Sequence, residues 1–103
     1  MYKIIITTTD NIKLAHSIKK YVLTHKLSPC VQIVKNIDSN YIWKKKIESA
    51  KEYMILIKCK TASLRPIKLF MDKEHNYDTY ELISIDIEII NAKYRKWFDG
   101  NCI

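Results

Sequence analysis

The apolar pattern of the chain predicts a single α+β domain, residues 1–103, in which strands and helices follow the order β-α-β-β-α-β and a short helix closes the sequence. Three observations lead to this prediction. Runs rich in β-branched residues lie near the start, in the middle and near the end of the chain, which is typical of strands. Stretches between these runs carry apolar residues at helical spacing. The chain also contains one Gly and two Pro, which leaves few tight turns and favours long elements.

The first strand and the first helix occupy the N-terminal quarter of the chain. Residues 3–9 are almost entirely β-branched, as expected of a central, buried strand. A helix over about 11–26 follows, capped by Asp10 or Thr9 and ended before Pro29. The helix residues that we expect to face the sheet, from their spacing, are Ile12, Ala15, Ile18, Val22 and Leu23.

A very long β-hairpin is predicted between Ser28 and Lys60. It begins with a β-rich run at Cys30–Ile37 and ends with another at Glu52–Lys60, and the polar and aromatic middle places its tip at Lys44–Lys46. Apolar residues fall on both faces at 53–57, so this strand should be central and covered on both sides. An arm of this length on a small domain is expected to lie against another copy of the chain.

The second helix follows the hairpin. Thr61 or Ser63 is expected to cap it, and Pro66 fits its first turn. The residues predicted to form its buried stripe are Leu64, Ile67, Phe70 and Met71. Residues 76–79 are interpreted as a connecting loop.

The last strand is predicted at Glu81–Ile89, because apolar and polar residues alternate strictly there. One face carries Ile83, Ile85, Ile87 and Ile89, and the other carries Ser84, Asp86 and Glu88. A C-terminal helix should start at Asn91 and end at Gly100. The aromatic residues on one side of this helix are Tyr94, Trp97 and Phe98.

This order of elements is the ferredoxin-like, split βαβ arrangement. Its helices cover one face of the sheet. The other face also carries apolar residues, and nothing else in the chain is expected to cover it. An exposed apolar face of this kind predicts self-association.

The charge and the cysteine content limit the binding partners and the cellular location that we expect for this protein. The net charge is +7, almost all of it from Lys, and Lys is poorly suited to bidentate recognition of bases and phosphates. The N-terminus shows no signal-peptide pattern, and no apolar run approaches membrane-spanning length. The three Cys residues are an odd number without CxxC spacing. We therefore expect free thiols and a cytoplasmic protein that binds no membrane, with nucleic acid ranked low among its partners.

Catalytic and metal-binding patterns are sparse. His16 and His25 are nine residues apart on one helix, which places them on opposite sides. No pair of residues has zinc-finger or HExxH spacing, and Cys30 and Cys59 fit small buried strand residues. The chain has no GxSxG motif and no Gly-rich phosphate loop, so no catalytic activity is expected.

Several blocks of the sequence, in order and with matching spacing, resemble the CutA family of divalent-cation tolerance proteins. These blocks are Cys30-Val31, Ser39-Asn40-Tyr41-Ile42-Trp43, Lys46-Ile47-Glu48, the segment Met54–Thr61, the segment His75–Leu82 and the segment Asn91–Trp97. The resemblance covers essentially the whole chain. It implies a homotrimer in which the long hairpins pair around a threefold axis.

The resemblance also implies a pocket between subunits. The positions that match the recurring polar and aromatic residues of the family are Tyr41, Trp43, Lys60, His75, Tyr77 and Glu81. Such a cleft could hold a small anion or a metal ion. Alternatively, the same residues stabilise the trimer, with Trp43 as an interface anchor, Lys60 and Glu81 as an ion pair, and His75 as a capping hydrogen-bonding group.

Copper ligands of the family are only partly present. Copper-binding relatives are proposed to use a Cys at the end of the first strand and a pair of His, whereas this chain has Thr at 7–9 and the pair Glu74-His75. Threonine is a poor ligand for copper. We expect no obligatory cofactor, and at most weak binding of a divalent ion such as Cu²⁺ through His75 with Glu74. Two prolines of the family's block are Asn76 and Tyr80 here, and its first Glu is Asp78.

Three functions follow from these observations. The first is a CutA-like homotrimer, not an enzyme, that serves in divalent-cation (copper) tolerance. The second is a signalling trimer like the PII proteins, which share this general fold and bind small effectors in subunit clefts. The third is RNA binding on a ferredoxin-like sheet, which requires exposed aromatic residues on the central strands. These strands carry Ile, Met and Leu instead, so RNA binding ranks last.

Overall fold

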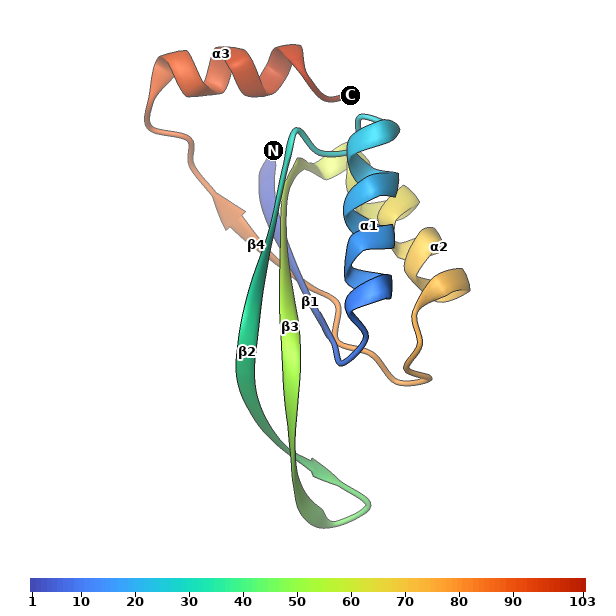
Figure 1. The fold of residues 1–103 in the computed structure, drawn as a ribbon. Coiled ribbons are helices and arrows are strands. Elements are labelled where there is room, and N and C mark those ends of the chain that lie inside the picture. Colours follow the sequence, from blue (N-terminus) through green and yellow to red (C-terminus); the bar gives the residue numbers. More distant parts are fainter.

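A four-stranded antiparallel sheet forms the centre of the structure, a computed structural model that describes residues 1–103 (Figure 1). Its strand order is β2-β3-β1-β4, with bounds β1 (Tyr2–Thr9), β2 (Cys30–Trp43), β3 (Lys46–Lys60) and β4 (Ile83–Ile87). The helices are α1 (Ile12–Thr24), α2 (Leu64–Glu74), which a short 3₁₀ turn (Thr61–Ser63) precedes, and α3 (Ala92–Gly100). The predicted β-α-β-β-α-β order with a C-terminal helix is therefore confirmed.

Helices α1 and α2 cover one face of the sheet and form the core with it (Figure 1). Strand residues of alternating position, such as Ile5, Ile55 and Ile57, point to this face and are at most 2% exposed. Their partners on the helices, all fully buried, are Ala15, Ile18, Val22, Ile67 and Met71. Burying apolar side chains of this size contributes roughly 1.5–3 kcal/mol each, so this one interface supplies most of the driving force for folding.

The start and the buried stripe of α1 differ in part from the prediction. Asn11 is the cap, because its side chain accepts hydrogen bonds from the backbone N–H groups of Lys13 and Leu14 at 2.9 and 3.2 Å. The expected cap residues Asp10 and Thr9 precede this position. The buried residues include Leu14, which the spacing argument omitted, whereas Leu23 is 40% exposed.

Ser63 occupies the cap position of α2 but does not cap it through its side chain. Its hydroxyl donates instead to the carbonyl of Leu27 at 2.6 Å, which ties the start of α2 to the end of α1. Pro66 lies in the first turn of α2, as predicted, where its missing N–H leaves no intrahelical bond unmade. The predicted buried stripe is confirmed by Ile67 and Met71, with Leu64 and Phe70 partly buried beside them.

The long hairpin is confirmed, and it forms an arm that extends beyond the body of the domain (Figure 1). The molecule measures 46 × 26 × 21 Å, and the arm accounts for its elongation. A bulge interrupts the pairing between Val34 and Ile37, where Asn36 has a φ of 60°. Trp43 pairs with Lys46 across the tip, so Lys44 and Lys45 form a two-residue turn with positive φ at both positions. This matches a type I′ turn.

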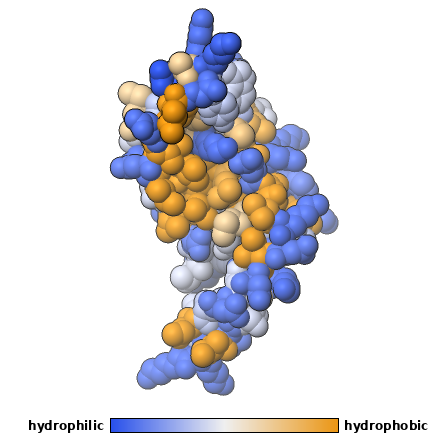
Figure 2. Space-filling view, turned by 90° about the vertical axis from the view of Figure 1, so that its left-hand side faces the viewer, coloured by the Kyte–Doolittle hydropathy of each residue, from blue (hydrophilic) through white to orange (hydrophobic).

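The face of the sheet opposite α1 and α2 is apolar over much of its area (Figure 2). Register places Ile83 opposite Ile6 and Ile85 opposite Ile4, and paired residues share a face. Leu56 pairs with Ile6 on the same face. Ile83 and Ile85 are each 50% exposed in the single chain. This open face agrees with the predicted second apolar surface.

Helix α3 covers one end of the open face, which the sequence argument did not anticipate. Phe98 of α3 is fully buried and packs edge-to-face on Tyr2, with ring centroids 5.5 Å apart. The Tyr2 hydroxyl donates to the carboxylate of Asp99 at 2.8 Å. The expectation that nothing in the chain covers this face is therefore wrong at this end, and the rest of the face stays open.

Strand β4 is shorter than predicted, since regular pairing covers only Ile83–Ile87 of the expected 81–89. It is an edge strand with a single partner, β1, so nothing extends its ladder on the outer side. Its isoleucines alternate as predicted. Among the cysteines, Cys59 is fully buried as expected, and burial raises the pKa of its thiol to about 11. Cys30, which was also predicted to be buried, is only partly buried, as is Cys102.

The two-residue turn at the tip generates the first testable prediction. Lys45 has a φ of 67°, a left-handed conformation that costs an L-residue roughly 1 kcal/mol and costs Gly almost nothing. We expect Lys45→Gly to raise the free energy of unfolding, measured by urea denaturation, by about 1 kcal/mol. The matched control is Lys51→Gly, at an exposed position inside β3, which should lower it by about 0.5–1 kcal/mol. Equal effects of the two substitutions would contradict the assigned turn.

Candidate functional site

A cavity of about 610 Å³ lies between the arm and the loop that connects α2 to β4. The arm contributes residues from β2 and β3, the loop contributes residues from 77 to 81, and β1 contributes Thr8 at its C-terminal end. Three aromatic side chains line the cavity: Tyr41 and Trp43 from the arm and Tyr77 from the loop. Tyr41 and Trp43 are 46% and 48% exposed in the single chain. The arm and the loop thus form opposite walls of one site.

The most buried polar group of the cavity is the carboxylate of Glu52, a residue that is only 7% exposed. The Tyr77 hydroxyl donates to its Oε2 at 2.6 Å. This bond joins the loop to β3, and burial together with the Glu52 bond raises the pKa of Tyr77 well above its usual value. No donor of the chain reaches Oε1 of Glu52. Since no buried side-chain polar atom lacks a partner, Oε1 keeps some exposure to solvent, and Glu52 lines the cavity.

Two further carboxylates line the same cavity, Asp78 and Glu81. Burial raises the pKa of Glu81, and the nearby Glu52 raises it further because two negative charges in one site repel each other. The remaining lining residues are neutral, and no Lys, Arg or His lines the cavity. The cavity is therefore acidic and aromatic, in a chain whose net charge is +7.

His75 lies behind the cavity and holds the loop in place. Its Nδ1 accepts a hydrogen bond from the backbone N–H of Tyr77 at 3.0 Å, so its Nε2–H donates to the carbonyl of Thr8 at 3.1 Å. Its ring stacks on that of Tyr80, with centroids 4.6 Å apart. Burial lowers the pKa of His75 below its usual value, which agrees with a neutral ring. His75 therefore positions Tyr77, the residue that bonds Glu52.

The predicted metal pair is not arranged as a metal site in the single chain. Both ring nitrogens of His75 are engaged in hydrogen bonds, so neither has an unused lone pair. Glu74 lines a different, smaller hollow of about 350 Å³ between α1 and α2. The structure contains no cluster of three or more His, Cys, Asp or Glu side chains that could hold a metal ion.

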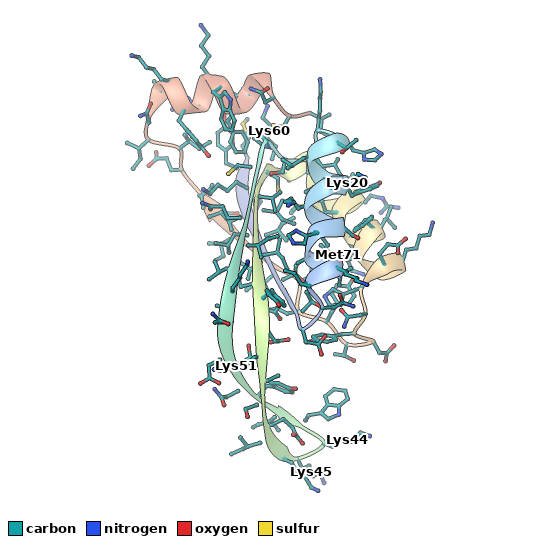
Figure 3. The ribbon with its side chains drawn as sticks, viewed as in Figure 1. Lys20, Lys44, Lys45, Lys51, Lys60 and Met71 are labelled. Carbon is teal, nitrogen blue, oxygen red and sulfur yellow. The ribbon has the colours of Figure 1, made fainter.

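Lys60, the remaining predicted pocket residue, lies elsewhere in the single chain. It occupies the end of β3 farthest from Lys44 and Lys45 at the arm tip (Figure 3), and its Nζ is 3.3 Å from the carboxylate of Asp99. The alternative in which Lys60 pairs with Glu81 is therefore not formed within one chain. Lys60 can reach this cavity only from a neighbouring copy.

The structure thus brings together four of the six predicted pocket residues, Tyr41, Trp43, Tyr77 and Glu81, with His75 directly behind them. The prediction placed this pocket between subunits, whereas these four residues line one cavity within a single chain. Sequence reasoning missed Glu52, which supplies the buried carboxylate. A signal was present: Glu52 precedes an apolar strand run and shares its face with Met54 and Leu56 by alternation. A charged residue directly beside apolar neighbours on one strand face is informative, because burial requires it to find a partner.

Comparison with known proteins gives a consistent result. Residues 3–101 match the family model described as CutA1 divalent ion tolerance protein. The chain is 30% identical over 98 residues to the chloroplastic protein CutA of Arabidopsis thaliana, covering 95% of this chain and 54% of that protein. It is 26% identical over 101 residues to the divalent-cation tolerance protein CutA of Thermus thermophilus, covering 98% of each. The chain thus spans about half the length of the plant relative and nearly all of the bacterial one.

Solved structures share the fold along the whole chain. The divalent cation tolerance protein Cut A1 of Thermus thermophilus superposes with a TM-score of 0.92 at 25% identity and 99% coverage of both chains. CutA1 of Oryza sativa gives a TM-score of 0.92 at 26% identity, covering 99% of this chain and 94% of that one. The periplasmic divalent cation tolerance protein CutA of Archaeoglobus fulgidus gives 0.91 at 29% identity, with 98% of each chain covered.

The contact between Tyr77 and Glu52 generates the second prediction. Tyr77→Phe removes the one donor to a carboxylate that is 7% exposed, so we expect the free energy of unfolding to fall by about 1–3 kcal/mol. The matched control is Tyr41→Phe, which deletes the hydroxyl of a half-exposed ring in the same cavity and should change stability by less than about 0.5 kcal/mol. Urea denaturation of both variants checks the contact, and an unchanged Tyr77→Phe protein would contradict its structural role.

Proposed function

Because this chain belongs to the CutA1 divalent ion tolerance family, we propose that it works as a homotrimer in the cellular response to divalent cations, with copper as the first candidate, and that it catalyses no reaction. The family match over residues 3–101, which spans every helix and nearly all of the sheet, is the observation that carries the proposal. A role for the assembled protein in metal tolerance, rather than turnover of a substrate, accords with the names of its relatives.

Two surfaces support the trimeric part of the proposal. The open face of the sheet exposes Ile83 and Ile85 to water, which is unfavourable (Figure 2). Contact with a second copy of the chain would bury these side chains. The arm exposes Ile42 and Ile47, which pair across its two strands and are 76% and 83% exposed. A two-stranded ribbon has little stability of its own in water, so an arm of this length gains from a partner.

Copper binding in this proposal is weak and not obligatory. His75 with Glu74 supplies the candidate ligands, and His75 would have to give up one of its two hydrogen bonds to ligate an ion. That loss opposes binding. The first-strand segment ends in Thr7, Thr8 and Thr9 and offers no thiolate. We therefore expect affinity for Cu²⁺ lower than that of a site with a Cys and two His ligands.

The cellular location is a separate part of the proposal. No helix of the structure has the length and apolar character needed to cross a membrane. The relatives differ in location, since one is described as chloroplastic and another as periplasmic. We propose the cytoplasm for this chain, because its three cysteines are an odd number without CxxC spacing.

A second candidate function is favoured by one observation, the cavity of about 610 Å³ between the arm and the loop. A volume of this size suits a small organic effector. On this alternative the chain is an effector-binding trimer comparable to the PII proteins. RNA binding has no comparable support, because the central strands direct Ile4, Ile6, Met54 and Leu56 to the open face. Their one aromatic ring on this face, Tyr2, is packed against Phe98 of α3.

The proposed assembly gives a prediction for the molar mass in solution. Light scattering coupled to size exclusion should report 3 × 12.2 kDa, about 37 kDa, at micromolar concentration. Ile85→Glu places a charge on the open face and should reduce the mass to that of one chain. Leu69→Glu, at a position of α2 that is 56% exposed, should leave the trimer intact. A wild-type protein that runs as a monomer would disprove the proposed assembly.

The tolerance role is tested by growth. Expression of this chain in a host that lacks its own family member should restore growth at an elevated copper concentration. The trimer-deficient Ile85→Glu variant should fail to restore growth, whereas Leu69→Glu should restore it at equal protein level. If the wild-type chain leaves copper sensitivity unchanged, the tolerance function is wrong even where the trimer forms.

A further inference from the structure

We propose that the cavity between the arm and the loop binds a small organic ammonium compound, with its cationic group between Glu52, Glu81 and the aromatic wall. This inference rests on the second candidate function, effector binding, and names the chemical class of the effector. It also replaces the small anion that the sequence suggested for this pocket.

Charge is the first argument. Three carboxylates, Glu52, Asp78 and Glu81, line the cavity, and no cationic side chain does. A small anion would enter a site of its own sign, and its desolvation would not be compensated. An ammonium group would be stabilised by the same carboxylates, most strongly by Glu52, which is buried, whereas Asp78 and Glu81 are exposed residues.

The geometry of Glu52 is the second argument. This residue is 7% exposed, and only its Oε2 has a partner, the Tyr77 hydroxyl at 2.6 Å. Its Oε1 accepts no hydrogen bond from the chain and keeps some exposure to solvent. That oxygen is free to accept a hydrogen bond from a ligand N–H donor in place of one from water. The site therefore favours a primary ammonium, which carries three donors, over a quaternary one.

The aromatic residues and the volume are the third argument. Tyr41, Trp43 and Tyr77 line the walls, and the faces of such rings attract cations. A bare metal ion would gain little here, because no three carboxylate, His or Cys side chains come close enough together to coordinate it. The volume of about 610 Å³ is also far larger than a single ion requires. An aliphatic diamine or an amine of similar size fits both the charge and the space.

An ammonium group could also come from the chain itself. Lys60 of a neighbouring copy carries the same chemistry, and within one chain it lies at the far end of β3 from this cavity (Figure 3). The proposal commits to a free ligand. A test must therefore compare the wild-type trimer with a variant that removes this lysine.

The experiment is titration calorimetry of the full-length protein at constant ionic strength with four probes: putrescine, tetramethylammonium, inorganic phosphate and Zn²⁺. We expect putrescine to bind with the highest affinity, tetramethylammonium to bind more weakly, and phosphate and Zn²⁺ not to bind at this cavity. Glu52→Gln should weaken putrescine binding at least tenfold, and Trp43→Leu should weaken it severalfold. The matched control Glu48→Gln, at an exposed arm position outside the cavity, should bind putrescine as the wild type does.

Each possible result of this experiment either supports or overturns the proposal. Absence of putrescine binding, binding that Glu52→Gln leaves unchanged, or preferential binding of phosphate overturns the proposal. Binding seen only after Lys60→Met shows that a neighbouring lysine fills the cavity, and it overturns the free ligand as well. Glu81→Gln gives a second test where Glu52→Gln does not fold, as judged by circular dichroism. The molar mass of each variant distinguishes failure of this inference, with the trimer intact, from failure of the proposed assembly.

Discussion

The constraint on which the rest of the structure depends is a sheet that is apolar on both faces and covered by helices on only one. Helices α1 and α2 bury Ile5, Ile55 and Ile57 on their side. On the other side Ile83 and Ile85 are half-exposed, and α3 covers only the end near Tyr2. Burying such surface is the dominant favourable term in association as in folding. The proposed trimer follows from this imbalance, and the long arm offers the contact surface that reaches beyond the body of the domain.

The arm and the loop before β4 are linked by a small set of polar contacts that also shape the cavity. His75 bonds the backbone of β1 through Thr8 and the backbone of Tyr77, and Tyr77 in turn bonds Glu52 of β3. Each of these groups is partly or fully buried, so losing one bond leaves another polar group without compensation. This connection explains why His75 acts as a positioning residue of the loop rather than as an evident ligand. It also explains how an acidic, aromatic cavity is maintained in a strongly basic protein.

The lysines of the chain have a different distribution from its carboxylates. Lys44 and Lys45 occupy the arm tip in a turn that Gly or Asn usually fills, and Lys60 is paired with Asp99 at the opposite end of the hairpin (Figure 3). The positive charge is thus spread along the outside of the molecule, while three carboxylates line one hollow. A cation approaching this site meets long-range repulsion and short-range attraction. Such an arrangement favours a cationic ligand whose shape fits the cavity over a small inorganic cation.

Local pattern was sufficient to predict the order of the elements, the buried stripe of α2, the hairpin with its tip at the lysine triplet and the alternation of isoleucines in β4. These features depend on residues within one or two turns or pleats of each other, which a single sequence displays directly. Three features were not predictable: the cap of α1 at Asn11, the short β4 and the contact of α3 with Tyr2. The local sequence allows more than one cap residue, strand length and helix position, and tertiary packing selects among them.

The candidate site, like the fold, was predicted only in part from the sequence. The sequence by itself predicted, through blocks that resemble a known family, that Tyr41, Trp43, Tyr77 and Glu81 belong to one pocket, which it placed between subunits. Only the tertiary structure decided that Glu52 is the buried acid of that pocket, that His75 lies behind it, and that Lys60 lies at the other end of β3. The physical reason is register: the Tyr77–Glu52 bond joins residues 25 positions apart, and its formation depends on how the loop closes over paired strands rather than on any local pattern.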